Sequence, residues 1–350
     1  MRLGLMLGYQ TPWSKPADHL AMAREADRLG YSVVWAAEAY GSDCVTMLSW
    51  IAAQTERIDV GSAVMQIPAR TPATTAMTAA TLDTLSGGRF RLGLGLSGPQ
   101  VSEGWHGVRW AKPLARTREY VDIVKMALAR QRVRYDGQTY QLPLPDGPGK
   151  ALQLTVHPVR EHIPIYLAAV GPKNLELTGE IADGWLAIFY APDYRDELFE
   201  HLESGRAKAG KTLEDFDVVT STTMVIGDDI EACAAPLRAM AALYVGGMGS
   251  REQNFYNALA ARMGYAEEAA EVQNRYLSRD YEGAAAAVPL EFVDSTALLG
   301  PPGRIAERMA AFAESGVTTL AVTPLAPTLE ERLQALSTAV EALDKSGAAG

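Results

Sequence analysis

Four side chains of this sequence have the chemistry to move a proton: Glu38, His106, Tyr9 and Tyr40. An imidazole titrates near neutral pH, so His106 could act as a general base, or it could serve only in packing. Each tyrosine stands where a strand is expected to end, and could donate a proton or merely line a pocket. Glu38 could act as an acid or form a structural ion pair with an arginine such as Arg70. The sequence thus offers proton transfer from one of four groups.

The run GLGLSG, residues 93–98, matches the G-x-G-x-x-G pattern of dinucleotide-binding loops. In such a loop the glycines follow a strand and open a helix, and an acidic residue stands about 20 positions later. Here the run itself has the character of a strand, with Gly93 and Gly95 on one side. Residues 99–105 look like a loop, and residues 116–118 contain no acid. The pattern therefore fails as a dinucleotide fingerprint.

The run AVGPKN, residues 169–174, has the composition of an anion site at the start of a helix. Gly171 lets the backbone approach an anion, Pro172 begins a helical turn, and helix N-termini offer free N–H groups to negative charge. Lys173 adds a positive charge. Because an ordinary strand-to-helix turn has the same residues, the sequence leaves both interpretations open.

Strand-like and helix-like segments alternate along the chain and must position these residues. Continuous apolar strands separated by helices are typical of a parallel sheet, and eight of them fit a closed α/β fold, the (β/α)8 or TIM barrel. We expect one domain over residues 1–350, with insertions at about 131–162 and 228–301, the first containing a hairpin with an Asp136-Gly137 turn. The expected strands are 2–7, 32–37, 59–65, 89–96, 163–169, 184–190, 217–227 and 316–324.

Functional residues of such barrels lie at the carboxyl ends of the strands. This rule selects candidates without any motif. They are residues 8–10, 38–40, 64–66, 97–103, 168–174, 189–190 and 323–324.

The composition excludes several classes of protein. The net charge is −10 and no basic run compensates it, which argues against a nucleic-acid partner. No apolar stretch approaches the roughly 20 residues that span a bilayer, and the N-terminus is too short for a signal peptide. Cys44 and Cys233 are isolated, which excludes a cysteine metal site. We expect a cytoplasmic protein with no metal.

Four blocks of the chain are distinctive: GYSVVWAAEAYGSD, VGSAVMQIPARTPATTAMTAATLDTLSGGRFRLGLGLSGP, IPIYLAAVGPKNLELTGEIADGWL and GPPGRIAERMAAFAESGVTTLAV. Together they resemble the bacterial-luciferase-like superfamily, in particular its branch that uses the deazaflavin coenzyme F420. The resemblance implies a TIM barrel whose fourth strand contains Gly93 and Gly95. Only Ser97 and Gly98 can then face a ligand.

The resemblance also implies a cofactor site at the strand ends. A non-proline cis peptide, Ala63–Val64, would form a bulge behind the deazaflavin ring, and Glu38 would lie beside the ring. The other implied cofactor-binding residues are Gln66, Ser97, Gly98 and Ser102 near the ring edge or ribityl chain, and Ala168, Ala169, Val170, Gly171, Pro172, Lys173 and Asn174 around the phosphate.

The function implied by the resemblance is hydride transfer between F420 and a small organic substrate, in a homodimer. One departure matters, because Ala39 stands where well-studied dehydrogenases of this branch have a basic or polar catalytic residue. Burial of Glu38 against the ring would favour its protonated form, which suits reduction of an activated C=C, C=N or C=O bond. An FMN-dependent monooxygenase and a non-catalytic F420-binding protein are the alternatives.

Overall fold

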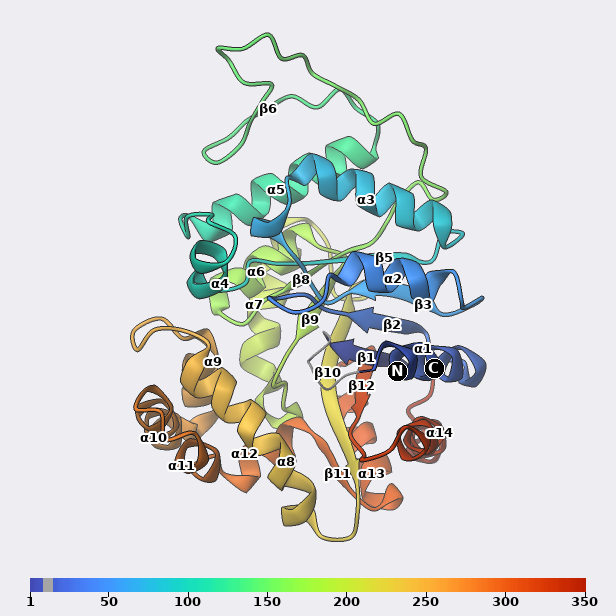
Figure 1. Ribbon diagram of the computed structural model, residues 1–350, viewed down its shortest axis with the longest axis vertical. Helices are drawn as coiled ribbons and strands as arrows, with labels where there is room; N and C mark the ends of the chain where they lie inside the picture. The colour runs from blue at the N-terminus through green and yellow to red at the C-terminus, as the bar shows by residue number, and fades with distance from the viewer. Residues whose placement is uncertain (9–14) are drawn as a thin grey trace.

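The computed structural model describes residues 1–8 and 15–350, and a closed barrel of parallel strands forms its centre (Figure 1). Within these residues each barrel strand pairs in parallel with two neighbours, and the last strand returns to the first, with Thr319 opposite Arg2. The predicted (β/α)8 barrel is therefore confirmed. In order around the barrel the strands are β1 (Arg2–Gly8), β2 (Val33–Ala36), β3 (Asp59–Ser62), β5 (Phe90–Gly95), β8 (Ile165–Ala168), β9 (Gly184–Ala187), β10 (Asp217–Ile226) and β12 (Thr319–Pro324).

The helices around the barrel begin at residues that satisfy or remove their free N–H groups. The Asp43 carboxylate accepts a hydrogen bond from the Thr46 N–H at 2.7 Å, and Thr328 forms a capping box with Glu331. Proline, which has no N–H to leave unpaired, opens several others. The helices are α1 (Pro16–Leu29), α2 (Cys44–Ala52), α3 (Pro72–Leu85), α5 (Pro113–Leu128), α6 (Pro172–Ile181), α7 (Arg195–Lys208), α13 (Pro302–Glu314) and α14 (Leu329–Ser346).

Side chains fill the interior of the barrel. A Cβ added to Gly61 would lie 2.4 Å from the Trp35 ring, so the glycine makes room for the indole. The interior is thus a packed core that leaves ligand binding to the ends of the strands. Its buried members are Val33, Trp35, Tyr166, Leu186, Val219 and Ala321.

The third strand is interrupted where a bulge is expected. β3 ends at Ser62, the Ala63–Val64 peptide bond is cis, and β4 (Met65–Gln66) then pairs with β5. A 3₁₀ turn, η1 (Ile67–Ala69), leads away from the strand. The expected cis peptide is therefore present, and the single strand expected over 59–65 is two short ones.

The glycines of the fourth strand are required by packing between strands. A Cβ on Gly93 would lie 1.8 Å from the Ser62 carbonyl oxygen, and one on Gly95 would lie 2.6 Å from Val64 Cγ2. The expectation of a loop over 99–105 is wrong, because α4 (Pro99–Gly104) is a short helix. The dinucleotide fingerprint still fails, since Gly93 and Gly95 lie inside β5.

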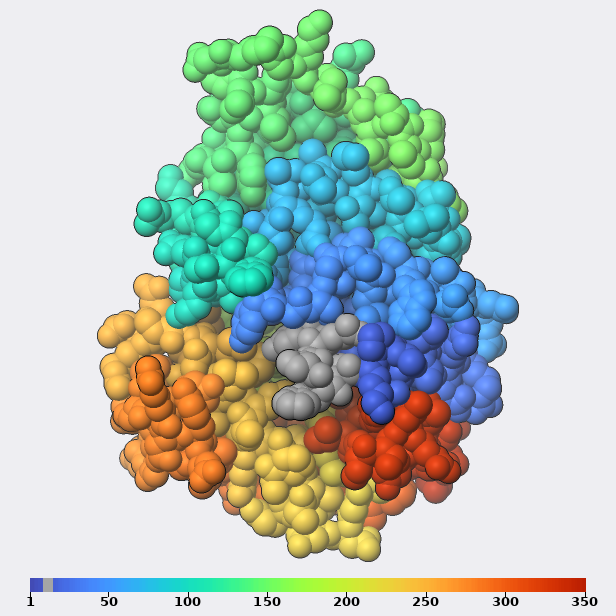
Figure 2. All heavy atoms as spheres, in the orientation of Figure 1, coloured from blue at the N-terminus to red at the C-terminus, as the bar shows by residue number. Residues whose placement is uncertain are grey.

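The first insertion is an arm that projects from one end of the molecule (Figures 1 and 2). It contains the expected hairpin, formed by β6 (Tyr135–Asp136) and β7 (Gln141–Leu142). The prediction that the turn lies at Asp136-Gly137 is wrong, because β6 ends at Asp136 and residues 137–140 connect the strands. The Glu119 carboxylate of α5 accepts hydrogen bonds from three successive backbone N–H groups of this connection, which stabilises the longer turn: Gln138, Thr139 and Tyr140.

The second insertion follows β10 and is mostly helical. In Figure 1 its helices α9, α10 and α11 lie with α4 on the side toward which the arrowheads of β1 and β2 point, which is the barrel mouth. The insertion therefore flanks the expected site. Its elements are α8 (Ile230–Ala242), the π-helical turn η3 (Leu243–Gly247), α9 (Phe255–Ala260), the π-helical turn η4 (Ala261–Tyr265), α10 (Ala266–Leu277), α11 (Tyr281–Ala286), α12 (Leu290–Thr296) and β11 (Leu298–Gly300); a 3₁₀ turn, η2 (Pro192–Tyr194), precedes α7.

Candidate active site

Glu38 follows β2 at the barrel mouth and is held by donors. Arg70 contacts both carboxylate oxygens, with Nη1 on Oε1 and Nη2 2.9 Å from Oε2. The Gln66 backbone N–H donates to Oε1 at 2.9 Å, and the Cys44 thiol lies 3.3 Å from Oε2. The Glu38 side chain is only 8% exposed. The structure thus contains the ion pair that the sequence left open as the alternative to an acid.

Arg70 joins two carboxylates at the mouth, since its Nη2 also lies 2.5 Å from Asp43 Oδ2. Burial alone would lower the pKa of Arg70, but the hydrogen bonds and charge of Glu38 raise it above its ordinary value. Burial has the opposite effect on the Cys44 thiol and raises its pKa, so the thiol remains neutral and can donate to Glu38. The cluster is a fixed charge arrangement around one guanidinium.

Gln66, Ser97 and His106 are brought together at the ends of β4 and β5. Nε2 of His106 lies 2.8 Å from Gln66 Oε1, and Gln66 Nε2 donates to Ser97 Oγ at 3.2 Å. The Gln66 side chain is buried. Because the Gln66 backbone N–H also binds Glu38, three of the predicted residues belong to one hydrogen-bonded chain with the ion pair.

Among the described residues, Tyr40 takes no part in this chain of contacts. Tyr40 is 55% exposed. It lies near Tyr276 of α10, whose pKa is raised mainly by burial and further by Tyr281 and Tyr40. Tyr9 lies outside the described residues. Of the three expected proton-transfer residues that the structure describes, Glu38 and His106 are linked through Gln66 and Tyr40 is not.

The loop after β8 is open where the anion site is expected. Gly171 caps α6 without any side-chain hydrogen bond, and a Cβ placed there would meet nothing within 4 Å. Asn174 Nδ2 donates to the Ala168 carbonyl at 3.3 Å and braces the loop. Lys173 is 81% exposed, with Nζ 3.2 Å from Glu176. Uncapped N–H groups and an exposed cation beside open space can hold an anion.

A second cation at this loop was not expected from the sequence. Arg262, in η4, donates through Nη2 to the Val170 carbonyl at 3.1 Å, and its Nε lies 3.0 Å from Glu197 Oε1. Residues 170 and 262 are 92 positions apart, so no local pattern could have paired them. The second insertion therefore places an arginine, paired with Glu197, beside the loop after β8.

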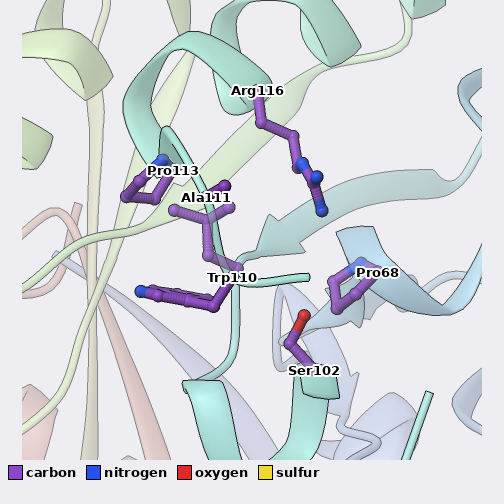
Figure 3. Close-up of a pocket in the computed structure, with 7 residues that line it drawn as sticks. Pro68, Ser102, Trp110, Ala111, Pro113 and Arg116 are labelled. Carbon is purple, nitrogen blue, oxygen red and sulfur yellow. The ribbon is translucent and has the colours of Figure 1, made fainter. Parts of the chain in front are cut away.

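Ser102 of α4 lines a small crevice that also borders η1 and the start of α5. Its hydroxyl donates to the Val108 carbonyl at 2.7 Å. Figure 3 shows Arg116 extending from α5 toward Pro68. The crevice measures about 10 Å³, which is room for about one water molecule. Its lining residues are Pro68, Leu96, Ser102, Trp110, Ala111, Pro113 and Arg116.

The residues at the mouth fit a cofactor with a polar ring edge and an anionic group. Beside the Gln66 amide and the Ser97 hydroxyl, a Cβ on Gly98 would meet only the Gln100 side chain, at 3.3 Å. The open space at Gly171 lies at the uncapped start of α6.

In residues 1–8 and 15–350 no helix is long and apolar enough to cross a membrane, and no group of three metal-ligating side chains occurs.

Comparison with known proteins places this arrangement in a family. The family model described as luciferase-like monooxygenase matches residues 1–319. The chain belongs to this family. A luciferase-like relative from Mycobacterium tuberculosis, named as a coenzyme F420-dependent oxidoreductase, is 45% identical over 92% of this chain and 95% of its own.

Two further similar proteins are named as tetrahydromethanopterin-linked reductases, and the name of the second contains coenzyme F420. The 5,10-methylenetetrahydromethanopterin reductase of Archaeoglobus fulgidus is 30% identical over 88% of this chain and 90% of its own. The coenzyme F420-dependent tetrahydromethanopterin reductase of Methanopyrus kandleri has the same fold, with a TM-score of 0.81 and 23% identity over 96% of this chain and 97% of that one. The expected membership of the F420-dependent branch of luciferase-like proteins is confirmed.

Proposed function

We propose that this luciferase-like protein binds F420 and transfers a hydride between the deazaflavin and a small organic substrate, as a reductase of an activated C=C, C=N or C=O bond. The observation that carries the proposal is the presence, at one barrel mouth, of a donor site for a ring edge and an open anion site. Bound F420 supplies the two-electron hydride chemistry, and the protein supplies orientation and charge.

Each part of the mouth has a role in this proposal. Gln66 and Ser97 donate to the polar edge of the ring, and the Ala63–Val64 backbone lies behind it. The start of α6, with Lys173, holds the phosphate, because uncapped N–H groups and a cation favour negative charge. Glu38 fixes Arg70 and the Gln66 backbone and so shapes the ring site.

Titration of the cofactor-free protein with F420 and with FMN, followed by fluorescence, tests the proposal. We expect tighter binding of F420. Tighter binding of FMN would instead favour the FMN-dependent monooxygenase. Oxidation of reduced F420 by a simple enone, imine or ketone then separates an enzyme from a non-catalytic F420-binding protein, which would bind F420 without turnover of any of the three.

The variant Glu38→Gln tests whether Glu38 acts on the cofactor site or as the acid. Loss of the carboxylate leaves Arg70 with a poorer partner, so we expect F420 affinity and enone-dependent turnover to fall together, each by about tenfold. A general acid contributes about 10²–10⁴ in rate. A fall of that size in turnover with unchanged affinity would show that Glu38 is the proton donor.

The homodimer also stays a proposal, and sedimentation of the purified protein tests it.

A further inference from the structure

The hydrogen-bonded set Gln66, Ser97 and His106 joins two strand ends and the loop after α4. The Gln66 side chain is 4% exposed, and both ends of its amide are occupied: Oε1 lies 2.8 Å from His106 Nε2, and Nε2 lies 3.2 Å from Ser97 Oγ. In the structure the amide oxygen faces His106 and the amide nitrogen faces Ser97, and burial between these two partners holds the carboxamide in place.

The placement of the amide oxygen beside His106 assigns the donor at that contact. An amide oxygen only accepts, so the His106 nitrogen beside it carries the proton. The lone pair of the neutral imidazole is then on Nδ1, and Nε2 cannot take a proton from a substrate. One N–H of the Gln66 amide binds Ser97, and the second has no partner in the part of the chain that the structure describes.

The backbone of Ser97 contributes to this geometry, because it has a φ of +63°. A residue with a side chain is uncommon in this left-handed region, and such residues concentrate at functional sites. The turn brings the Ser97 hydroxyl to Gln66 and leads directly to Gly98, where an added Cβ would meet only the Gln100 side chain, at 3.3 Å.

We infer that His106 is a positioning residue: its Nε2–H fixes the Gln66 carboxamide so that the second amide N–H donates to a carbonyl oxygen on the pyrimidinedione edge of the cofactor. The inference rests on the proposed cofactor binding. It removes His106 from the groups that act on the substrate and makes Gln66 the residue that reads the ring edge.

The first test needs no cofactor. Nitrogen-15 NMR of the purified protein at alkaline pH, where imidazoles are neutral, reports which nitrogen of His106 is protonated. We expect the Nε2–H tautomer, and a changed signal in Gln66→Leu. An Nδ1–H tautomer, or a signal indifferent to Gln66→Leu, would overturn the inference whatever the cofactor is.

The second test is a double-mutant cycle on cofactor affinity with His106→Phe, Gln66→Leu and both together. Gln66→Leu should weaken F420 binding about tenfold and His106→Phe somewhat less, while the double variant should bind no more weakly than Gln66→Leu alone. FMN has the same pyrimidinedione edge, so its affinity should change by the same factors. His157→Phe, in the arm, is the matched control and should leave both affinities unchanged.

Additive losses in the cycle would show that His106 acts independently of Gln66 and would overturn the inference. Binding of FMN without F420 would refute the proposed function alone, because the cycle can still be completed with FMN. If neither cofactor binds, the proposed function fails, and so does the role of Gln66 at a ring edge.

Discussion

The two ends of the barrel both contain buried arginine–carboxylate clusters but differ in what surrounds them. At the N-terminal end, Arg91 lies between Asp59, with Nε 2.8 Å from Oδ2, and Asp217, with Nη1 3.2 Å from Oδ2. The Tyr166 hydroxyl donates to the same Asp217 oxygen at 3.0 Å, and Thr319 donates to the other at 2.8 Å. This cluster ties the first residues of β3, β5 and β10 together.

At the mouth, Arg70 lies between Glu38 and Asp43 in a similar way. The start of α6 at the same mouth, however, lies beside open space, since a Cβ on Gly171 would meet nothing within 4 Å. The same kind of ion pair therefore closes the structure at one end and borders the proposed cofactor site at the other. Position in the barrel, rather than residue type, separates stability from function.

The largest expected effect is at the N-terminal end. Arg91→Leu leaves Asp59 and Asp217 without their shared cation, and breaking such a buried pair costs about 3–5 kcal/mol. Urea denaturation measures the loss. F420 affinity of the folded fraction should stay unchanged. Arg2→Leu is the matched control, since Arg2 also binds Asp217, at 3.1 Å, but its side chain is 44% exposed, so it should cost much less. Equal losses would contradict the comparison.

The next effect is at the mouth and concerns binding. Gly171→Ala introduces a methyl group into open space, so we expect a loss of stability below about 1 kcal/mol but F420 binding weaker by at least about tenfold. In Gly93→Ala the methyl group would fall 1.8 Å from the Ser62 carbonyl oxygen, and that variant should not fold. Thermal melting and fluorescence titration measure the two quantities; unchanged F420 affinity in Gly171→Ala would move the phosphate site elsewhere.

A smaller effect is expected from charge at the same loop. Lys173→Glu places negative charge at the start of α6 and should weaken F420 binding about fivefold, with little change in stability. Lys208→Glu is matched, because Lys208 binds the same Glu176 carboxylate, at 2.5 Å, from α7. If both variants weaken binding equally, the effect is one of net charge, and Lys173 does not contact the phosphate.

The smallest effect is on the pH dependence of stability at the mouth. Burial alone would raise the pKa of Asp43, but hydrogen bonds from Thr46 and the charge of Arg70 hold it below its ordinary value. A carboxylate with a lowered pKa in the folded protein stabilises it above the unfolded pKa, and this contribution is lost as the pH falls through the folded pKa. The difference in unfolding free energy between the protein and Asp43→Asn should therefore shrink between about pH 5 and pH 2. A constant difference would show that Asp43 is not linked to protonation.

Much of the fold could be predicted from local patterns. Apolar runs marked the strands, and the helices between them end at local signals such as Gly30, which closes α1 with a φ of +82°. The turn at 137–140 could not be predicted, because it depends on Glu119 of a preceding helix. The prediction of a loop after Gly98 was wrong because α4 has only six residues, which are too few to show a helical period in the sequence.

The sequence by itself determined the barrel, the strand ends that form its mouth and the family, because hydrophobic periodicity and short motifs are local properties of the chain. Only the tertiary structure decided what those residues do to one another. It paired Glu38 with Arg70, put His106 on Gln66, and brought Arg262 to the Val170 carbonyl. Hydrogen bonds and ion pairs act over a few ångströms, and the closed barrel alone brings residues so far apart in the chain within that distance.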